Sequence, residues 1–244
     1  MTAATGAGSA SIKEPGYWWY RARAGLLQAA LERYVGAPDL VLDVGSADGP
    51  SVGWMRRYGR HVSLDVDRRG LRGQGVCGSA LALPFADATF DVVAAFDVIE
   101  HCEPESRALQ ELRRVLKPGG RLLLAVPAYE WAWTRFDDVN GHHRRYTRPR
   151  LVAAVTAAGL RVNRATYAFT GVFPFFALDR VRSRLAERAG RVDSNPVDDG
   201  VVTLPSVPPP VERVLLALCR VDRALLSRRR DLPFGSSVFL AAER

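Results

Sequence analysis

The sequence predicts an α/β fold in which helices cover both faces of a mostly parallel sheet. The first observation is an apolar run, residues 40–42, that ends in Asp43 and a glycine-rich turn. The second is a similar run that ends in Asp65, and the third is the stretch 90–96, which is apolar on both faces, as a central strand is. Segments with helical spacing of apolar residues separate these runs, and this alternation is typical of parallel sheets.

The turn after the first strand has the composition of a ligand-binding loop. Gly45 and Gly49 permit positive φ angles and close approach of a ligand to the backbone. Asp65 follows about 20 residues later, where an acid usually accepts the hydroxyl groups of a ribose. Asp43 lies beneath the loop, where its carboxylate would repel a pyrophosphate and attract a cation. The expected ligand is therefore a cationic nucleoside such as S-adenosylmethionine.

Further motifs extend this pattern. They are residues 83–85, 90–91, 97–101 and 112–120. Together with the glycine loop and Asp65 they form an ordered set within about residues 17–159. The set resembles the class I S-adenosylmethionine-dependent methyltransferases of the bacterial small-molecule type, although Ala47 and Ser79 depart from common family residues. The resemblance implies S-adenosyl-L-methionine as the cofactor and methylation of oxygen or nitrogen in biosynthesis or secondary metabolism. It also implies a Rossmann-like, doubly wound sheet of seven strands, whose antiparallel last strand inserts beside the fifth.

The same patterns predict the elements of the first part of the chain. Residues 1–16 are small and polar, lack the apolar core of a signal peptide, and are expected to form a flexible tail. The expected elements that follow are a helix over 17–34, a strand over 39–44, a helix over 51–58, and strands over 60–66 and 73–78. The resemblance places the first helix over the cofactor as a lid, and the alternative is a helix that only packs its aromatic residues on the core.

The second part of the chain contains one unusual stretch. The expected elements are the strand over 90–96, a helix over 105–116, a strand over 121–126, a helix over 149–158, and strands over 160–169 and 236–242. Residues 127–147 are too aromatic and too numerous for a plain connection. Long loops beside a ligand crevice are usually functional, so this stretch is expected to contribute to the site.

After residue 170 the resemblance fades. We expect a single domain over 17–244 with a helical and loop insertion over about 171–232. Its segment 173–210 would form one wall or lid of the acceptor pocket. The insertion contains an arginine-rich helix over 177–189 and a loop or partly disordered linker over 193–210. It ends in a helix whose apolar stripe consists of Val211, Val214, Leu215, Leu218, Val221 and Leu225.

The carboxyl ends of the strands collect the residues expected to bind the cofactor. Asp65 would accept the ribose hydroxyls, Ser79 or a backbone amide beside it would bond the adenine, and Arg23 would pair with the methionyl carboxylate. The complete set expected to bind the cofactor is Trp18, Arg23, Asp43, Gly45, Ser46, Gly49, Asp65, Val66, Ser79, Ala80 and Phe96.

The candidate catalytic residues are His142 and His143, which follow the fifth strand on the crevice side. An imidazole there would take the proton of a hydroxyl acceptor as the methyl group arrives. The alternative is that these histidines hold the loop through hydrogen bonds to Asp137 or Asp138. The residues expected to bind the substrate are His101, Trp133, Arg144, Arg145 and Tyr146. The two arginines suit an anionic group of the substrate, or equally an ion pair with Asp137.

The composition limits the remaining possibilities. Hydrophobic residues make up 48% of the 244 residues, and the net charge is +8, nearly all of it from arginine. The scattered Cys77, Cys102 and Cys219 fit a reducing cytoplasm without disulfides. The acids of residues 127–147 lack metal-ligand spacing, so no metal is expected, and no apolar run approaches the ~18 residues of a membrane span. We expect a cytoplasmic monomer or homodimer, with the inner face of the membrane as an alternative location.

Three functions remain open on the sequence alone. The first is a methyltransferase of small molecules. The second is a peripheral membrane methyltransferase of a lipid-linked sugar or quinone, suggested by the aromatic and arginine-rich helix that begins near Phe173. The third is a non-catalytic binding protein on the same fold, which the intact cofactor residues disfavour. The basic residues do not form a known nucleic-acid module, so no nucleic-acid partner is expected.

Overall fold

A seven-stranded sheet forms the centre of the molecule in the computed structural model, which describes residues 14–45, 53–71, 75–189, 197–198, 201–202 and 204–244. Its strands are β1 Leu40–Val44, β2 Arg60–Asp65, β3 Val76–Cys77, β4 Phe90–Phe96, β5 Leu116–Pro127, β6 Arg161–Ala168 and β9 Ser237–Glu243. Their order is β3-β2-β1-β4-β5-β9-β6, and only β9 runs antiparallel to its neighbours. The expected sheet, with an antiparallel last strand beside the fifth, is confirmed.

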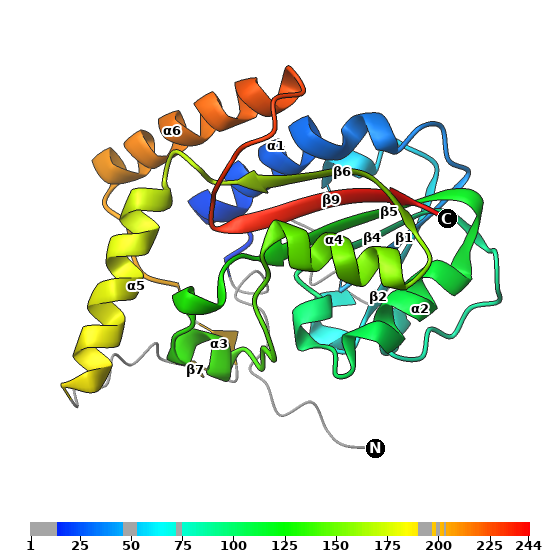
Figure 1. The fold of residues 1–244 in the computed structure, drawn as a ribbon, viewed down its shortest axis with the longest axis horizontal. Coiled ribbons are helices and arrows are strands. Elements are labelled where there is room, and N and C mark those ends of the chain that lie inside the picture. The colour runs from blue at the N-terminus through cyan, green and yellow to red at the C-terminus, as the bar shows by residue number, and fades with distance from the viewer. Residues whose placement is uncertain (1–13, 46–52, 72–74, 190–196, 199–200, 203) are drawn as a thin grey trace.

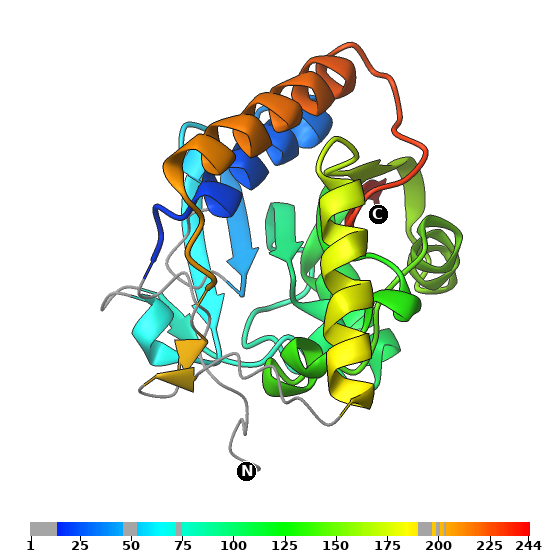
Figure 2. The same cartoon turned by 90° about the vertical axis from the view of Figure 1, so that its left-hand side faces the viewer.

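Helices cover both faces of this sheet (Figure 1). On one face α1 (Trp18–Leu31) and α6 (Pro209–Ser227) pack side by side, as Figures 1 and 2 both show. On the other face lie α2 (Glu105–Val115) and α4 (Arg148–Ala157). The remaining helices are α3 Arg135–Val139, α5 Phe173–Arg188, and the 3-10 turns Glu32–Tyr34, Gly53–Met55, Arg68–Leu71, Ile99–His101 and Glu130–Ala132.

The core lies on both faces of the central strands. Every residue of β4 except Asp91 is buried, because helices cover this strand from both sides. Asp91 closes the amino end of the strand, where its carboxylate accepts hydrogen bonds from the amides of Asp39 and Leu40 at 3.1 and 3.0 Å. The same carboxylate pairs with Lys117 at 2.7 Å. Asp91 therefore aligns β1, β4 and β5 at the edge of the sheet opposite the expected ligand.

Three elements differ from their expected boundaries. Within the expected helix over 51–58 the described residues form only a 3-10 turn, Gly53–Met55. Strand β5 begins at Leu116, earlier than expected, because Gly119 and Gly120 continue the pairing through two 3.0 Å backbone bonds with Arg244. Helix α5 begins at Phe173, because a proline in the first turn of a helix costs no hydrogen bond.

The expected apolar stripe of α6 is buried only in part. Val211, Val214 and Val221 are 48%, 55% and 58% exposed. The face that packs on the molecule instead contains Leu215, Cys219, Asp222 and Leu226. Asp222 is included because its carboxylate accepts the amide of Gly171 at 3.2 Å, a requirement that an apolar stripe does not reveal.

The stretch between α5 and α6 is described only in part. Two short strands, β7 (Val197–Asp198) and β8 (Val201–Val202), pair antiparallel where a loop or linker was expected. The expected tail over 1–16 falls mostly outside the described residues. Among the residues that the structure describes, no helix has both the length and the hydropathy needed to cross a bilayer.

Candidate active site

Three aspartates gather at the carboxyl edge of the parallel strands. Asp43 and Asp65 end β1 and β2 and are 4% and 6% exposed, and Asp97 directly follows β4. These strands are neighbours in the order β2-β1-β4. The fold thus collects three acids, distant in sequence, at the edge where open parallel sheets bind their ligands.

Gly45 has two structural reasons to be glycine. Its φ is +70°, which L-residues with a side chain adopt only with strain. A Cβ atom at this position would also lie 2.4 Å from Cγ2 of Val98. The amide of Gly45 donates to the carbonyl of Leu64 at 2.8 Å, which fixes the start of the loop on β2. Ser46 and Gly49, also expected to bind the cofactor, lie outside the described residues.

Asp65 and Val66 present a polar and an apolar group next to each other. The Asp65 carboxylate accepts the amide of Asp67 at 2.8 Å, which orients the side chain at the end of β2. Val66 is 58% exposed, an unusual state for an apolar side chain that follows a buried acid. This pair matches the needs of a nucleoside, whose ribose takes hydrogen bonds and whose base takes an apolar cover.

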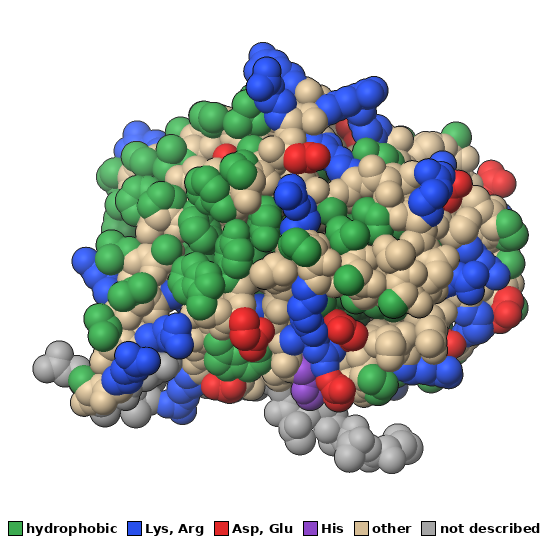
Figure 3. All heavy atoms as spheres, in the orientation of Figure 1, with side chains coloured by type: hydrophobic (Ala, Val, Ile, Leu, Met, Phe, Trp, Pro, Cys, Tyr) green, Lys and Arg blue, Asp and Glu red, His purple; other side chains and the backbone are tan. Residues whose placement is uncertain are grey.

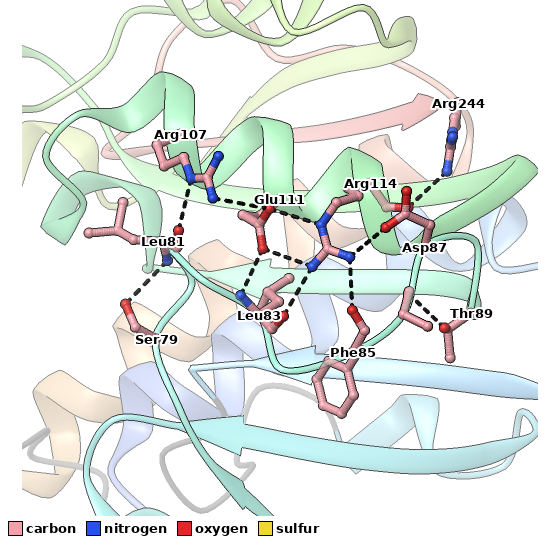
Figure 4. A network of polar contacts seen from close by, with 11 residues as sticks. Ser79, Leu81, Leu83, Phe85, Asp87, Thr89, Arg107, Glu111, Arg114 and Arg244 are labelled. Carbon is pink, nitrogen blue, oxygen red and sulfur yellow. Dashed lines mark hydrogen bonds and ion pairs between the residues drawn. The ribbon is translucent and has the colours of Figure 1, made fainter.

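The loop that carries Ser79 and Ala80 is fastened to α2 by a polar network (Figure 4). Glu111 accepts the amide of Leu83 at 2.8 Å, and the guanidinium of Arg114 donates to the carbonyls of Leu83 and Phe85 at 3.0 and 2.8 Å. Arg114 also bonds Glu111 at 2.9 Å, and this bond holds the pKa of the Glu111 carboxyl below its usual value of 4.5.

The network has a consequence for the expected adenine site. It fixes the turn in which the Ser79 hydroxyl accepts the amide of Leu81 at 3.2 Å. Ala80, the next residue of this turn, and Phe96, at the end of β4, are buried, at 6% and 8% exposure. Residues of the 112–120 motif therefore act on the site through the loop that they hold.

Arg23 reaches the edge of the sheet from α1. Its side chain is 1% exposed and forms an ion pair with Asp97 at 2.6 Å. Its guanidinium lies over the ring of Trp19, 4.9 Å from the centroid. Within the described residues, Nη1 of Arg23 and the indole nitrogen of Trp18 meet no acceptor in hydrogen-bond geometry. A buried cation with unfilled donors suits a carboxylate ligand, because buried polar groups are normally satisfied.

Residues with positive φ angles follow three of the strands that end at this edge. Asp97 after β4, Tyr129 after β5 and Phe169 after β6 have φ angles of 57°, 62° and 66°. Such angles cost of order 1–3 kcal/mol for non-glycine residues and tend to cluster at functional sites. The three strained residues mark the same edge as the aspartates.

A second group of polar side chains lies beyond Asp97. Glu100, His101 and His142 each offer a ligand atom within 4.8 Å of the other two. The pieces of backbone that carry them are joined, since the amide of His143 donates to the carbonyl of Glu100 at 2.8 Å. The sequence does not reveal this group, because Glu100 and His142 lie on separate loops that only the fold brings together.

The three residues differ in burial, since Glu100 is 0% exposed, His142 is half-buried and His101 is exposed. Burial together with the nearby charge of Asp97 raises the pKa of the Glu100 carboxyl well above the usual value. Desolvation by the groups packed around the ring and the neighbouring His142 lower the pKa of His101 to about 4. His101 is therefore a neutral imidazole near neutral pH, with a lone pair to share.

Asp137 organises the rest of this loop. Its carboxylate lies 2.7 Å from Nδ1 of His142 and 2.8 Å from the guanidinium of Arg145, and it accepts the amide of Thr134 at 3.0 Å. Burial opposes ionisation of Asp137, but the bond to His142 and the charge of Arg145 outweigh it and lower the pKa of this carboxyl. His142 and Arg145 therefore adopt the contacts with Asp137 that were the alternatives to direct functional roles.

The other residues expected to act on the substrate also have partners inside the chain. Arg144 pairs with Glu103, and the Tyr146 hydroxyl donates to Glu105 at 2.5 Å. The indole of Trp133 donates to Asp138 at 3.0 Å. His143, in contrast, is exposed. The expected roles of these residues in substrate binding and catalysis remain predictions.

Comparison with known proteins identifies the family. Residues 42–124 match the family described as methyltransferase domain. A protein of Encephalitozoon cuniculi, named as a methyltransferase, is 40% identical over 164 residues that cover 57% of this chain and 78% of the relative. The chain belongs to the class I S-adenosylmethionine-dependent methyltransferases. The demethylmenaquinone methyltransferase of Thermobifida fusca is 38% identical over 39% of this methyltransferase and 46% of the relative.

The structural comparison agrees on the fold. A methyltransferase in a complex with the Haloferax volcanii Trm112 methyltransferase activator has a TM-score of 0.57, with 95% of this chain and 96% of that chain covered. At 15% identity this likeness shows the fold alone. The chain spans less than half the length of several curated relatives, among them a bifunctional biotin biosynthesis protein of Cellvibrio japonicus, at 32%.

The residues at the sheet edge fit the cofactor of this family. The positive φ of Gly45 and its contact with Val98 form a cradle that a side chain would fill. The exposed Val66 beside the buried Asp65 provides an apolar and a polar surface for a nucleoside. The expected cofactor, S-adenosylmethionine, is confirmed by the family, and the assignment of individual residues to it remains a prediction.

Proposed function

We propose that this methyltransferase methylates a hydroxyl group of a small-molecule acceptor, which binds beside Glu100, His101 and His142. The observation that carries the proposal is the buried contact between His142 and Asp137, at 2.7 Å. A carboxylate behind an imidazole orients the ring and stabilises its protonated form. Such a pair at the carboxyl edge of β4 and β5 suits the removal of a proton from an acceptor, and an amine or carbon acceptor would need it less.

For this reaction the chain must bind the cofactor and the acceptor, orient them, and exclude water. S-adenosylmethionine supplies a methyl group on a positively charged sulfur. Asp65 would hold its ribose and Arg23 its carboxylate, and the buried walls around Phe96 would keep water away. As the methyl–oxygen bond forms and the methyl–sulfur bond breaks, the hydroxyl proton passes to the Glu100, His101 and His142 group. The products are a methyl ether and a neutral thioether.

The wall of the acceptor pocket would come from the aromatic loop and α5. Tyr129 stacks on Trp131 with ring centroids 5.9 Å apart, and Phe173 of α5 packs at 5.6 Å from Tyr129. Two arginines of α5 fasten the helix to this loop, because Arg180 donates to Thr134 at 2.5 Å and Arg184 to the carbonyl of Trp131 at 2.7 Å. Trp131 is 40% exposed, so its side chain is accessible to a ligand. This arrangement supports the expected role of the insertion as a pocket wall.

The test is a transfer assay with isotopically labelled cofactor and a panel of hydroxylated and aminated small molecules. We expect label in a phenol or alcohol, and a loss of about 10²–10⁴ in turnover for His142→Ala, the usual contribution of general acid–base catalysis. Asp137→Asn should share part of this loss. Cofactor affinity should stay within threefold in both variants. Label found only in amines would contradict the proposal.

A second candidate function is methylation of a lipid-linked acceptor at a membrane surface, which the apolar face of α5 favours. Phe175, Leu178, Val181 and Leu185 lie on one side of the helix and are each 48–58% exposed. Figure 3 shows hydrophobic side chains gathered over α5 and α6 on this face of the molecule. An exposed apolar helix face with arginines around it is typical of proteins that lie on anionic membranes.

Sedimentation with vesicles separates the two candidates. The second predicts binding to vesicles of anionic lipid at low salt, weaker binding at high salt, and loss of binding in the double variant Leu178→Asp with Leu185→Asp. Neutral phosphatidylcholine vesicles serve as the control. If the wild-type protein stays in the supernatant with anionic vesicles at low salt, the membrane function is wrong and the first candidate stands.

A further inference from the structure

The group formed by Glu100, His101 and His142 has a feature that a role as general base alone does not explain. Glu100 is completely buried, and neither of its carboxylate oxygens has a hydrogen-bond partner within the described residues. A buried polar group without a partner costs free energy, so such groups are rare in native structures. One carboxylate oxygen of Glu100, one imidazole nitrogen of His101 and one of His142 all lie within 4.8 Å of one another.

The His142 imidazole has one nitrogen engaged, which leaves the other for a ligand. Nδ1 of His142 is held by Asp137, at 2.7 Å. The His101 ring lies beside the backbone of Asn140 and Gly141. Metal-binding histidines are held in this way by a carboxylate or a carbonyl on the second nitrogen, which fixes the tautomer and the ring plane. The two rings meet edge to face, with centroids 4.6 Å apart, so both can turn a nitrogen toward one point.

We propose that Glu100, His101 and His142 bind a divalent transition-metal ion, of which Zn²⁺ and Mn²⁺ are the best matches. One carboxylate and two imidazoles form a donor set typical of catalytic metal sites, in which positions remain open for a substrate. Mg²⁺ and Ca²⁺ prefer sets made of oxygen alone and should bind more weakly. Ligand atoms lie about 2.0–2.2 Å from zinc, so small side-chain rotations would close the present spacing.

The ion would also take part in the proposed methylation, and this part of the inference rests on the proposed function. A cation in this place would bind the acceptor oxygen and lower the pKa of its hydroxyl, so that the proton leaves before or as the methyl group arrives. His142 would then serve as a ligand, and Asp137 would position it. The requirement for a metal and the requirement for a cofactor are separable, because the ion binds without S-adenosylmethionine.

Calorimetry tests the site directly. The full chain, freed of metal with a chelator and dialysed, is titrated with ZnCl₂, MnCl₂ or MgCl₂ in the absence of cofactor. We expect one Zn²⁺ per chain, and at least tenfold weaker binding in Glu100→Gln and in His142→Ala. The matched control is His143→Ala, which removes the adjacent exposed histidine outside the group and should bind Zn²⁺ as the wild type does. Thermal unfolding with and without Zn²⁺ shows whether each variant is folded and whether the ion stabilises it.

The outcomes separate this inference from the proposed function. Equal loss of Zn²⁺ binding in His142→Ala and His143→Ala, or no stoichiometric binding by the wild type, would overturn the metal site. Titration with S-adenosylmethionine reports on the methyltransferase itself, and Glu100→Gln should keep its cofactor affinity within threefold. Loss of methyl transfer after chelation, restored by Zn²⁺ or Mn²⁺ with unchanged cofactor affinity, would support the role of the ion at the acceptor. Full activity with chelator present would contradict that role.

Discussion

At the scale of single residues, Gly45 and Asp65 illustrate two different constraints on one ligand site. Gly45 is constrained by space and by its backbone angle, since a Cβ atom would lie 2.4 Å from Val98. Asp65 is constrained by what its carboxylate can accept at the end of β2. Substitutions at the two positions should therefore weaken cofactor binding for different physical reasons.

For Gly45, the chain provides a matched control in Gly36. Gly36 has nearly the same φ, +68° against +70°, but a Cβ atom there would meet nothing within 4 Å. Gly36→Ala should cost only the strain of the left-handed region, about 1–2 kcal/mol, and leave cofactor binding unchanged. Gly45→Ala adds the contact with Val98 and should weaken S-adenosylmethionine at least tenfold in calorimetry. Equal affinities in the two variants would show that the loop does not approach the cofactor.

For Asp65, the prediction is a loss of hydrogen bonds to the ribose. Each unpaired hydroxyl costs roughly 1–3 kcal/mol, so Asp65→Ala should bind S-adenosylmethionine at least tenfold more weakly. Asp67→Ala is the control, because the Asp67 side chain pairs with Arg69 and only its backbone amide contacts Asp65. Isothermal titration calorimetry of both variants with S-adenosylmethionine measures the two affinities. Wild-type affinity in Asp65→Ala would remove this residue from the cofactor site.

At the scale of elements, α2 fixes the loop beside the expected adenine site through charged side chains. Glu111 and Arg114 lie on the face of the helix that meets the loop of Leu83 and Phe85, as Figure 4 shows. The loop has little regular structure of its own, so its position depends on these bonds. This dependence makes its stability sensitive to acid.

The direction of the pH effect follows from the pKa of Glu111. The bond from Arg114 lowers this pKa in the folded state, so the folded protein gains stability above pH 4.5, the unperturbed pKa, and loses it as the pH falls through the folded value. Glu111→Gln should lower the free energy of unfolding at pH 7 by about 1.5–3 kcal/mol. The difference from wild type should shrink below pH 4. Urea denaturation across this range measures it, with the exposed Glu14→Gln as a control that should show no difference at any pH.

At the scale of the whole molecule, the seven-stranded sheet and the segment between β6 and β9 have different roles. The sheet and its covering helices hold the cofactor edge. Helix α5 and the pair β7 and β8 add no strand to this sheet, and α5 contacts the aromatic loop through Arg180 and Arg184. Helix α6, in contrast, packs on α1 and is fastened to β6, because Arg164 donates to the carbonyl of Leu226 at 3.5 Å.

A deletion tests this division of roles. Replacement of residues 176–206 by a short glycine–serine linker should leave a cooperative thermal transition and cofactor affinity within threefold of wild type. Methyl transfer should fall at least tenfold if, as proposed, this segment forms a wall of the acceptor pocket. Collapse of the fold, seen as a lost near-ultraviolet circular dichroism signal, would make this segment part of the core.

The sequence by itself determined the sheet and the acids at its edge. An apolar run that ends in an acid and a glycine is a local pattern, and the strand order confirmed where such ends meet. Asp43, Gly45 and Asp65 were found in this way, because the reason for each residue lies within a few positions of it. The boundaries of α5 and β5 were less accurate, since they depend on a proline in the first helical turn and on pairing between Gly120 and Arg244.

Only the tertiary structure decided which distant side chains share a site. His101 ends a short turn after β4 and His142 lies on the loop after α3, and neither pattern indicates the other. They meet because the amide of His143 bonds Glu100 and because Arg144 donates to the carbonyl of Cys102. The buried face of α6 was likewise decided by its neighbours, which selected Asp222 over exposed valines. Periodicity reports what one segment can bury, whereas contacts between segments depend on the path of the whole chain.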